Sequence, residues 1–532
     1  MKRAAAVVML VMRVMLVLVL VATGCGRTPP TPVAAPRTPV PKIATEKLVA
    51  GAVSAVSRLD DFDEQRAYEQ AFDRLAQWAQ ATLPEAAEWR PDPLVETLPE
   101  RLRQGCEPRL AQRTFDAGGD VTALRDRRWL ADIAAAARGD SADDVEVAGK
   151  LFDWVVRSLA LVGDPPMVPT ADTPGTRWFQ LGEVLLSGRA SAAQRSWVFL
   201  ELLRQAGIDG VMLATGGSGE PRPWLPAAVI GGEAYLFEPT YGLPIPGTAG
   251  RPATARQAAA EPDVLAALSL PDRPYPVKAA DAAGVSVLVP ADGWGLSRRM
   301  QQLDRVVQPR HGVRMADDAS AVGRRAAAAL PGADPAIALW QFPFETELRR
   351  RGDSAVEPHL ARELAPLAVV VVAEGPRGQE ASRPLFKARV RDFRGAFDGP
   401  DGAKAAYLAA RPSREVIQQA VQGAPPEQAA AVERLYRQMK EDATYWLGIV
   451  TLGEGQPEAA VDFLRRMTLE NSPDSRWTDA ARANLGRALA ALGRIDEAVA
   501  VLREDGSPQR FGSRLLADRL ERERQERTSP AP

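Results

Sequence analysis

The feature that most constrains the fold is an internal repeat near the C-terminus. Six positions recur with a constant offset of 38 residues, and all are apolar or small. The first copy has Leu447, Gly448, Gly455, Ala460, Val461 and Leu464, and the second has Leu485, Gly486, Gly493, Ala498, Val499 and Leu502. A repeat of this length is typical of paired helices that stack on one another. The sequence therefore predicts helical repeats in an all-α region over residues 403–532.

Each copy resembles a tetratricopeptide unit, although the usual period is about 34 residues. The resemblance implies that Gly448 and Gly486 let two helices approach closely, and that Ala460 and Ala498 fill the narrow contact. We expect the additional residues to lengthen the turn around 471–475. Two alternatives follow for the stacked helices. They form a concave groove that binds peptides, or they form a helical bundle that packs on the rest of the chain.

The N-terminus has the pattern of an export signal. Lys2 and Arg3 precede an apolar stretch that ends at Val21, and small residues stand immediately before Cys25. The pattern resembles a bacterial lipobox, which implies that residues 1–24 are a cleaved signal peptide and that Cys25 carries the lipid. Gly26 stands where an aspartate would retain a lipoprotein at the inner membrane, so the resemblance favours the outer membrane. The alternative is an uncleaved membrane anchor, which Arg13 within the apolar stretch opposes.

A proline-rich segment follows the predicted lipid anchor. Residues 28–42 read TPPTPVAAPRTPVPK, and repeated prolines hold a chain extended and prevent a packed core. We therefore predict a tether over residues 25–44, which would hold a folded body away from the membrane and facing the periplasm.

Composition excludes several classes of function. The 66 lysines and arginines nearly balance the 68 acidic residues, so no strong positive charge would attract nucleic acid. Two cysteines and two histidines in the whole chain do not supply a cysteine/histidine metal site, and no cofactor motif is visible. We therefore predict neither nucleic acid nor metal nor cofactor as a ligand.

Residues 147–250 have the pattern of an α+β unit. A helix around KLFDWVVRSLAL and a second around SAAQRSWVFLELLRQAG precede the short apolar runs LPAAVI and AYLFEPTYG. This order resembles a transglutaminase-like (papain-like) domain over about a fifth of the chain. With the run PWLPAAVI…YLFEPTYGLPIPG and no cysteine at the start of the second helix, these features are similar to those of planctomycete lipoproteins that carry such domains.

The resemblance also shows which catalytic groups are missing. Active members use a cysteine, a histidine and an aspartate, as nucleophile, base and orienting acid. Here the cysteine position falls at Ala192, the histidine position falls near Trp224, and only Glu238 keeps the acid. The resemblance thus implies a degenerate cleft around Ser191, Ala192, Trp224 and Glu238, with no catalytic residue. One alternative makes Ser191 the nucleophile of a rearranged hydrolase or acyltransferase site.

Two arginines near this cleft leave a further choice open. Arg189 and Arg195 either line the cleft with Glu238 and Trp224, or form structural ion pairs beneath it. Cys106 has no histidine beside it that could activate the thiol. We expect it to be a small packing residue.

The remaining segments are expected to be helical over 45–146 and mixed over 251–402. Helices are predicted at 297–303 and 318–330, and the run LAVVVVAE predicts one buried strand. His311 and His359 stand in charged surroundings and are expected at the surface. The whole is thus a multidomain protein with α+β and all-α parts.

Three functions are compatible with these patterns. The first is an envelope lipoprotein that acts as a non-catalytic scaffold and binds proteins or peptides of the envelope. The second is the hydrolase or acyltransferase with a rearranged site. The third is a module that binds peptidoglycan or another glycan in the degenerate cleft.

Overall fold

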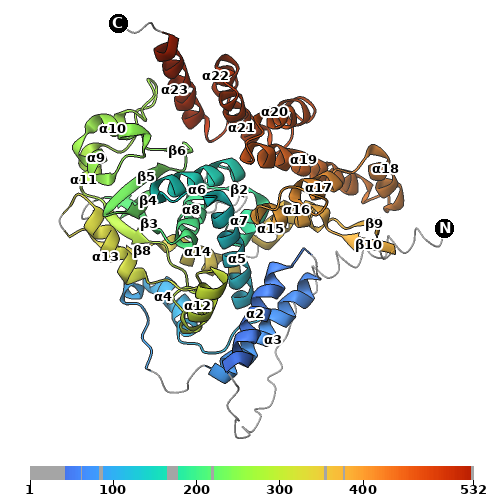
Figure 1. Cartoon of the computed structure of the whole chain (residues 1–532), viewed down its shortest axis with the longest axis horizontal. Helices are drawn as coiled ribbons and strands as arrows, with labels where there is room; N and C mark the ends of the chain where they lie inside the picture. The colour runs from blue at the N-terminus through green and yellow to red at the C-terminus, as the bar shows by residue number, and fades with distance from the viewer. Residues whose placement is uncertain are drawn as a thin grey trace.

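The structure is a computed structural model that describes residues 42–60, 63–82, 88–163, 178–216, 221–332, 334–352, 356–375 and 378–528. The predicted signal peptide and Cys25 lie outside these residues. Helices dominate the described chain, and one six-stranded sheet lies to one side of them, at the left of Figure 1. The predicted fold class is therefore confirmed in its coarse form, as α+β together with all-α parts.

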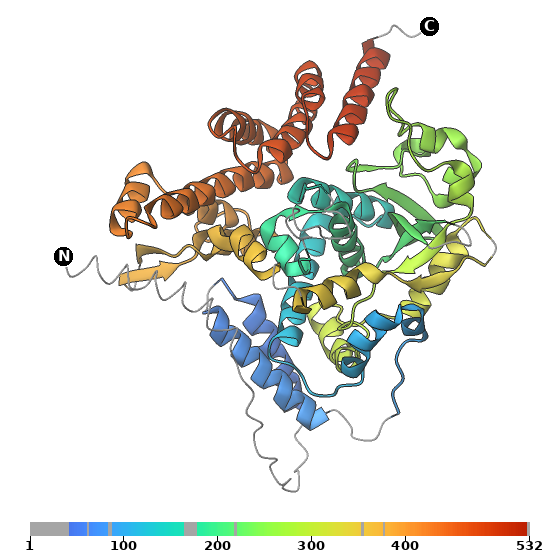
Figure 2. The same ribbon diagram turned by 180° about the vertical axis from the view of Figure 1, so that it is seen from behind.

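The N-terminal part is helical. Its elements are α2 (Lys42–Ser57), α3 (Glu64–Thr82), the 3₁₀ helix η1 (Pro93–Thr97), α4 (Glu100–Leu110) and α5 (Gly119–Arg138). Helix α2 takes in the last three residues of the predicted tether. The helices α2 and α3 form a hairpin that packs on α5 and projects from the body (Figures 1 and 2). On α3, Ala71, Leu75 and Trp78 are buried at helical spacing, which explains why this face packs inward.

The α+β unit begins with helices and ends with strands. Its elements are α6 (Asp144–Ser158), β1 (Ala160–Leu161), α7 (Leu181–Ser187), β2 (Arg189–Ala190), α8 (Ala192–Ala206), β3 (Asp209–Thr215), β4 (Arg222–Ile230), β5 (Glu233–Glu238) and β6 (Leu243–Pro244). Asp143 caps α6 by accepting from the backbone nitrogens of Val145 and Glu146. Gly207 ends α8 in the left-handed conformation, with φ of 84°.

The central sheet has the strand order β6-β5-β4-β3-β7-β8. Neighbouring strands are antiparallel except for β7 (Ser286–Val289) and β8 (Ile337–Leu339), which are parallel. Helix α8 packs on one face of β3 and β4, and α13 (Ala319–Ala329) packs on the sheet through a separate core. Side chains alternate between the two faces, so Phe237 lies on the α8 side and Leu236 on the α13 side.

The middle region supplies β7 and β8 of the six-stranded sheet, a separate pair of strands and a set of helices. Its other elements are η2 (Thr248–Gly250), α9 (Ala255–Ala260), α10 (Pro262–Ala266), α11 (Ala279–Ala283), α12 (Arg298–His311), α14 (Gln341–Gly352), α15 (Val356–Leu364), η3 (Ala365–Ala368), β9 (Val371–Gly375), β10 (Gly378–Ser382) and α16 (Pro384–Phe393). The helices predicted at 297–303 and 318–330 are confirmed as α12 and α13, which Ser297 and Asp318 cap.

The prediction of a buried strand in LAVVVVAE is wrong. Strand β9 pairs only with β10 in a two-stranded hairpin, and 47% of the surface of Val372 is exposed. The hairpin lies near α17 and α18 at one end of the molecule (Figures 1 and 2). A run of β-branched residues identifies a strand, but it does not show whether a second element covers it.

The C-terminal part consists of helices. They are α17 (Ala403–Ala409), α18 (Arg414–Gly423), α19 (Ala429–Gly453), α20 (Pro457–Val461), the π-helical segment η4 (Asp462–Glu470), α21 (Thr478–Ala491), α22 (Ile495–Arg503) and α23 (Arg510–Thr528). In the first copy of the repeat, the chain after α20 is thus wound as a π-helix. A π-helix holds more residues per turn than an α-helix, so it contains part of the additional residues before the turn at 471–477. In Figure 1, α19 to α23 lie along one side of the body.

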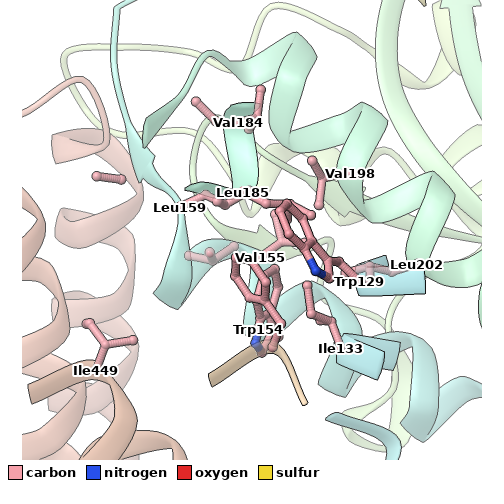
Figure 3. Close-up of a cluster of buried hydrophobic side chains, with 14 of the residues drawn as sticks. Trp129, Ile133, Trp154, Val155, Leu159, Val184, Leu185, Val198, Leu202 and Ile449 are labelled. Atoms are coloured by element: carbon pink, nitrogen blue, oxygen red, sulfur yellow. The ribbon is translucent and has the colours of Figure 1, made fainter. Parts of the chain in front are cut away.

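One large hydrophobic core joins these parts. It contains buried residues from α5, α6, α7, α8, α16, α19 and α21. Figure 3 shows Trp129 of α5 among Val198 and Leu202 of α8, and Ile449 belongs to the same cluster. The helical repeats are therefore packed into the body of the molecule through shared apolar side chains.

Candidate functional site

The first predicted cleft residue, Ser191, caps a helix. Its hydroxyl accepts a hydrogen bond of 3.2 Å from the backbone nitrogen of Gln194, whose side-chain oxygen accepts one of 3.0 Å from the nitrogen of Ser191. This reciprocal capping box follows from the sequence Ser-Ala-Ala-Gln and fixes Ala192 as the first residue of α8. Only 6% of Ser191 is exposed. The hydroxyl thus satisfies an unpaired amide at the start of the helix.

Trp224 stands at a bulge in β4. Leu213 of β3 pairs with Leu225, and the next residue of β3 pairs with Pro223, so Trp224 is an additional residue without a partner in the ladder. A bulge changes the direction in which a side chain points. Here the indole packs against the α13 side of the sheet.

Glu238 and Trp224 are joined through Tyr275, which the sequence did not single out. The Trp224 indole nitrogen donates to the Tyr275 hydroxyl at 3.0 Å, and this hydroxyl donates to Glu238 Oε2 at 2.5 Å. The other carboxylate oxygen accepts from the backbone nitrogen of Thr240 at 2.9 Å. Burial raises the pKa of both Glu238 and Tyr275. The acid is thus held by a phenol and an amide, with no imidazole to orient.

The structure divides the four predicted cleft residues between two places. Glu238 shares its sheet face with Leu236, on the α13 side, whereas α8 packs on the opposite face against Phe237. Trp224 and Glu238 are therefore brought together, while Ser191 and Ala192 start the helix on the other side. The resemblance to a transglutaminase-like cleft implied one site, and the alternation of the strand separates its members.

Arg195 occupies the position one turn after Ala192 and is buried. Its guanidinium donates to Leu159, Val156 and Pro239 carbonyl oxygens and to the side-chain oxygen of Gln509. All these acceptors are neutral, and the carbonyls of Val156 and Leu159 lie at the C-terminal end of α6, where the helix dipole favours a cation. Burial lowers the pKa of Arg195 to about 9. Arg195 thus joins α6, α8 and the C-terminal segment rather than lining a cleft.

Arg189 follows the second alternative, the structural ion pair. Its guanidinium lies 2.8 Å from the carboxylate of Glu363 on α15, and about a quarter of its side chain is exposed. The two arginines near the predicted cleft therefore both have structural partners.

The glycines of the repeat lie at helix contacts. A Cβ atom built on Gly448 would come within 2.8 Å of Leu464, and one built on Gly486 within 2.5 Å of Leu502. Ala460 and Ala498 are fully buried. These distances leave no room for a side chain between α19 and η4, or between α21 and α22.

The first helix of each repeat turns its buried side chains toward the α+β unit. Gly188 lies directly against the indole of Trp446 on α19. On α21, Asn484 donates to the carbonyl of Arg157 at 3.2 Å, and Arg487 donates to the carbonyl of Gly242 at 3.0 Å. Of the two alternatives for the repeats, the structure thus favours the bundle that packs on the rest of the chain. The face that α19 and α21 turn toward the α+β unit is therefore covered.

A groove remains where α6 meets α19. It encloses about 750 Å³, and its walls come from α5, α6, residues 250–252, the loop after α16 and the end of α19. Figure 3 shows Trp154 of α6 and Ile449 of α19 on the two sides of this junction. Its lining includes Glu146, Lys150, Asp153, Trp154, Arg157 and Arg251.

Ion pairs hold the charged side chains of this groove. Lys150 lies 2.7 Å from Glu146, and Arg251 lies 2.5 Å from Asp143. Asp153 accepts from Arg487 at 2.9 Å, which ties α6 to α21. Sequence reasoning missed the groove because its walls are up to about 300 residues apart in the chain.

Of the remaining predicted residues, Cys106 is buried and the two histidines are half-buried. Burial raises the pKa of the Cys106 thiol to about 11, and the thiol donates to the carbonyl of Arg103 at 3.4 Å. Both histidines expected at the surface are partly exposed. His311 is half-buried, and His359 keeps 24% of its side chain exposed while its ring lies 5.5 Å from that of Phe179. Within the described residues, no group of three or more His, Cys, Asp and Glu side chains is placed to hold a metal ion.

No described helix is both long enough and apolar enough to cross a membrane. Comparisons with known proteins were equally without result: no protein-family model matches the sequence, and no curated protein or solved structure matches it. The function proposed for the chain is therefore based on the contacts described above.

Proposed function

We propose that the chain is a non-catalytic protein of the bacterial envelope that binds a protein or peptide segment in the groove between α6 and α19. The observation that carries this proposal is the groove itself. It is open, it has a volume of about 750 Å³, and it lies where the α+β unit and the repeats meet. Ligand sites occur preferentially at such junctions, with volumes of about 300 to 1,000 Å³.

The chemistry of the groove favours a peptide. Trp154 lines the groove with the 8% of its surface that is exposed, and side chains of both signs line it as well, among them Lys150, Asp153 and Arg251. A peptide offers apolar side chains, charges of both signs and backbone amides, so it complements such a surface. Lys150 is 42% exposed and Arg251 is 54% exposed, so both are available to a partner despite their ion pairs.

The contacts of Ser191 and Glu238 support a binding role over the hydrolase or acyltransferase. A serine nucleophile needs a base within hydrogen-bond reach. The described hydrogen-bond partner of the Ser191 hydroxyl is the amide of Gln194, and Glu238 is engaged by Tyr275 on the opposite face of the sheet. Both residues therefore have structural roles that account for their presence.

A lipid anchor would place this groove near a membrane. The proposed anchor at Cys25 precedes α2 by 16 residues, which span about 50 Å when the chain is extended as polyproline. The proposal therefore includes tethering to the outer membrane, with the folded body facing the periplasm. Partners would be envelope proteins or their extended segments.

Site-specific photocrosslinking in the native envelope tests the proposal. A photoreactive phenylalanine replaces Glu146, which lines the groove and is 57% exposed, and in the matched control it replaces Glu69, which is exposed on α3. We expect discrete protein adducts at position 146, absent at position 69 and reduced in a chain that also carries Lys150→Glu and Arg251→Glu. Equal adducts at both positions, or adducts to glycan strands alone, would overturn the peptide proposal, and the second outcome would favour the glycan-binding alternative.

A further inference from the structure

A second cavity lies away from the groove, at the C-terminal end of α8. It encloses about 570 Å³. Its walls come from the end of α8, the start of β3, the end of β7, and the helices α12 and α13, together with residues 90–93 and 314–319. Five arginines and six acidic residues line it.

The acidic residues of this cavity are all engaged by the protein itself. Asp92, Asp304 and Asp318 accept hydrogen bonds from backbone amides. Asp209 accepts a bidentate pair of hydrogen bonds from Arg325. Glu201 and Asp317 are bound by Arg204, and Glu201 also accepts from the buried Arg127 at 3.0 Å. None of these carboxylates needs a further cation.

Three of the arginines, by contrast, have no acidic partner. Within the described part of the chain, Arg90, Arg305 and Arg314 form no ion pair, and Arg305 donates only a long bond of 3.4 Å to Gln302. Arg204 has a buried Nε hydrogen without an acceptor, although its other nitrogens are bound. Among the described residues, three arginines without an acidic partner thus line the cavity, of which Arg90 and Arg305 are exposed and Arg314 is half-buried, and one buried donor has no acceptor.

Hydrogen bonds of neighbouring residues fix the backbone of two of these arginines. The side-chain amide of Gln205 both donates to and accepts from the backbone of Arg314, at 2.9 Å in each case. Arg90 lies between two anchored residues, since Trp89 donates to Gln301 at 2.9 Å and Asp92 accepts from Ser320. Arg305 stands on the rigid helix α12. The backbones of the three arginines are therefore held where these residues line the cavity.

We propose that this cavity binds a small organic molecule through a phosphate or carboxylate group. Guanidinium groups bind both oxyanions through paired N–H bonds, and Arg90, Arg305 and Arg314 have such donors to spare. The volume of 570 Å³ accommodates more than a single oxyanion, so the remainder of the ligand fills the space over Leu200, Val289 and Ile208. This site is separate from the groove between α6 and α19, and either could exist without the other.

Calorimetric titration of the mature chain tests the site with three probes of similar size. Glucose 6-phosphate carries the phosphate, gluconate carries the carboxylate, and glucose is the neutral control. The variants are Arg314→Gln and Arg305→Gln, and the matched control is Arg66→Gln, an exposed arginine on α3 far from the cavity. Thermal unfolding of each variant shows that it is folded.

We expect saturable binding of one or both anions and none of glucose. Each cavity variant is expected to weaken binding at least about tenfold, while Arg66→Gln leaves it unchanged within about twofold. Binding of glucose 6-phosphate alone assigns a phosphate ligand, and binding of gluconate alone assigns a carboxylate. Absence of anion binding, equal binding of glucose, or full affinity in folded Arg314→Gln and Arg305→Gln would overturn the proposal.

Discussion

The guanidinium of Arg195 on α8 donates a 2.7 Å hydrogen bond to the side-chain oxygen of Gln509, the residue before α23. The same group holds carbonyl oxygens of Leu159 and Pro239, so one buried side chain joins the α+β unit to the C-terminal helices. An arginine with five N–H donors suits this place because each donor meets an oxygen. Arg195 thus has a structural role in α8.

Replacing Arg195 by methionine should destabilise the chain by about 3 kcal/mol or more, because several buried oxygens lose their donor. Arg66→Met, on the exposed face of α3, should change the free energy of unfolding by less than about 0.5 kcal/mol. Denaturant unfolding of both variants measures the difference. Similar stability of Arg195→Met and the unchanged chain would mean that the buried guanidinium contributes nothing to holding the two parts together.

Gly188 should be intolerant of a side chain. It has a φ of 64°, and a Cβ atom on it would lie 2.1 Å from the ring of Trp446. The guanidinium carbon of Arg389 lies 3.6 Å from the centroid of the same ring. Gly188→Ala is expected to cost about 3 kcal/mol or more, from backbone strain and overpacking together.

Gly231 is the matched control for Gly188, since its φ is 60° and no atom lies within 4 Å of its added Cβ. Gly231→Ala should cost only the backbone strain, about 1 to 2 kcal/mol. Thermal unfolding compares the two. Equal costs would show that the repeats do not press against the α+β unit at Trp446.

The repeat glycines should behave in the same way. Gly448→Ala and Gly486→Ala should each destabilise the protein by about 1 to 3 kcal/mol, because Leu464 and Leu502 lie too close for a methyl group. Gly149→Ala, in the interior of α6 with no atom within 4 Å of the added Cβ, should stabilise it by about 0.5 to 1 kcal/mol. Chemical denaturation of the three variants checks the opposite signs.

Stability should depend on pH through Glu347. Burial raises the pKa of this carboxyl from 4.5 to about 7, although Arg109 and Arg351 bind it. Between pH 4.5 and about 7, the folded state therefore keeps a proton on Glu347 that the unfolded state has lost. The contribution of Glu347 to the free energy of unfolding decreases as pH rises through this range. The decrease is on the order of 3 kcal/mol.

Glu347→Gln removes this titration. Unfolding free energies measured from pH 5 to pH 8 should therefore fall less steeply in the variant than in the unchanged chain. A parallel pH dependence of the two proteins would show that Glu347 is already ionised in the folded state at pH 5.

Much of the fold could be predicted from local patterns. The periodicity of α12 and α13, their caps at Ser297 and Asp318, and the hairpin of β4 and β5 all follow from residues that lie close together in the chain. The constant offset of the repeat likewise identified paired helices. Such features depend on neighbours within one element, which a sequence displays directly.

The candidate site could not be predicted in the same way. The groove between α6 and α19 and the partner Tyr275 of Glu238 are created by contacts between distant segments. The bulge at Trp224 places its ring on the face opposite to the one that regular alternation predicts, and no residue pattern indicates a bulge there. The pairing of β9 with β10 alone likewise depended on contacts between distant segments, which no local pattern displays.

The central claim, that the groove between α6 and α19 is a binding site, is tested most directly by hydrogen–deuterium exchange. The chain without the predicted signal peptide is compared with and without the partner that crosslinks to position 146. We predict slower exchange in α6 and in the last two turns of α19, with α2 and α3 unchanged. Protection that falls elsewhere and leaves α6 and α19 unaffected would contradict the account.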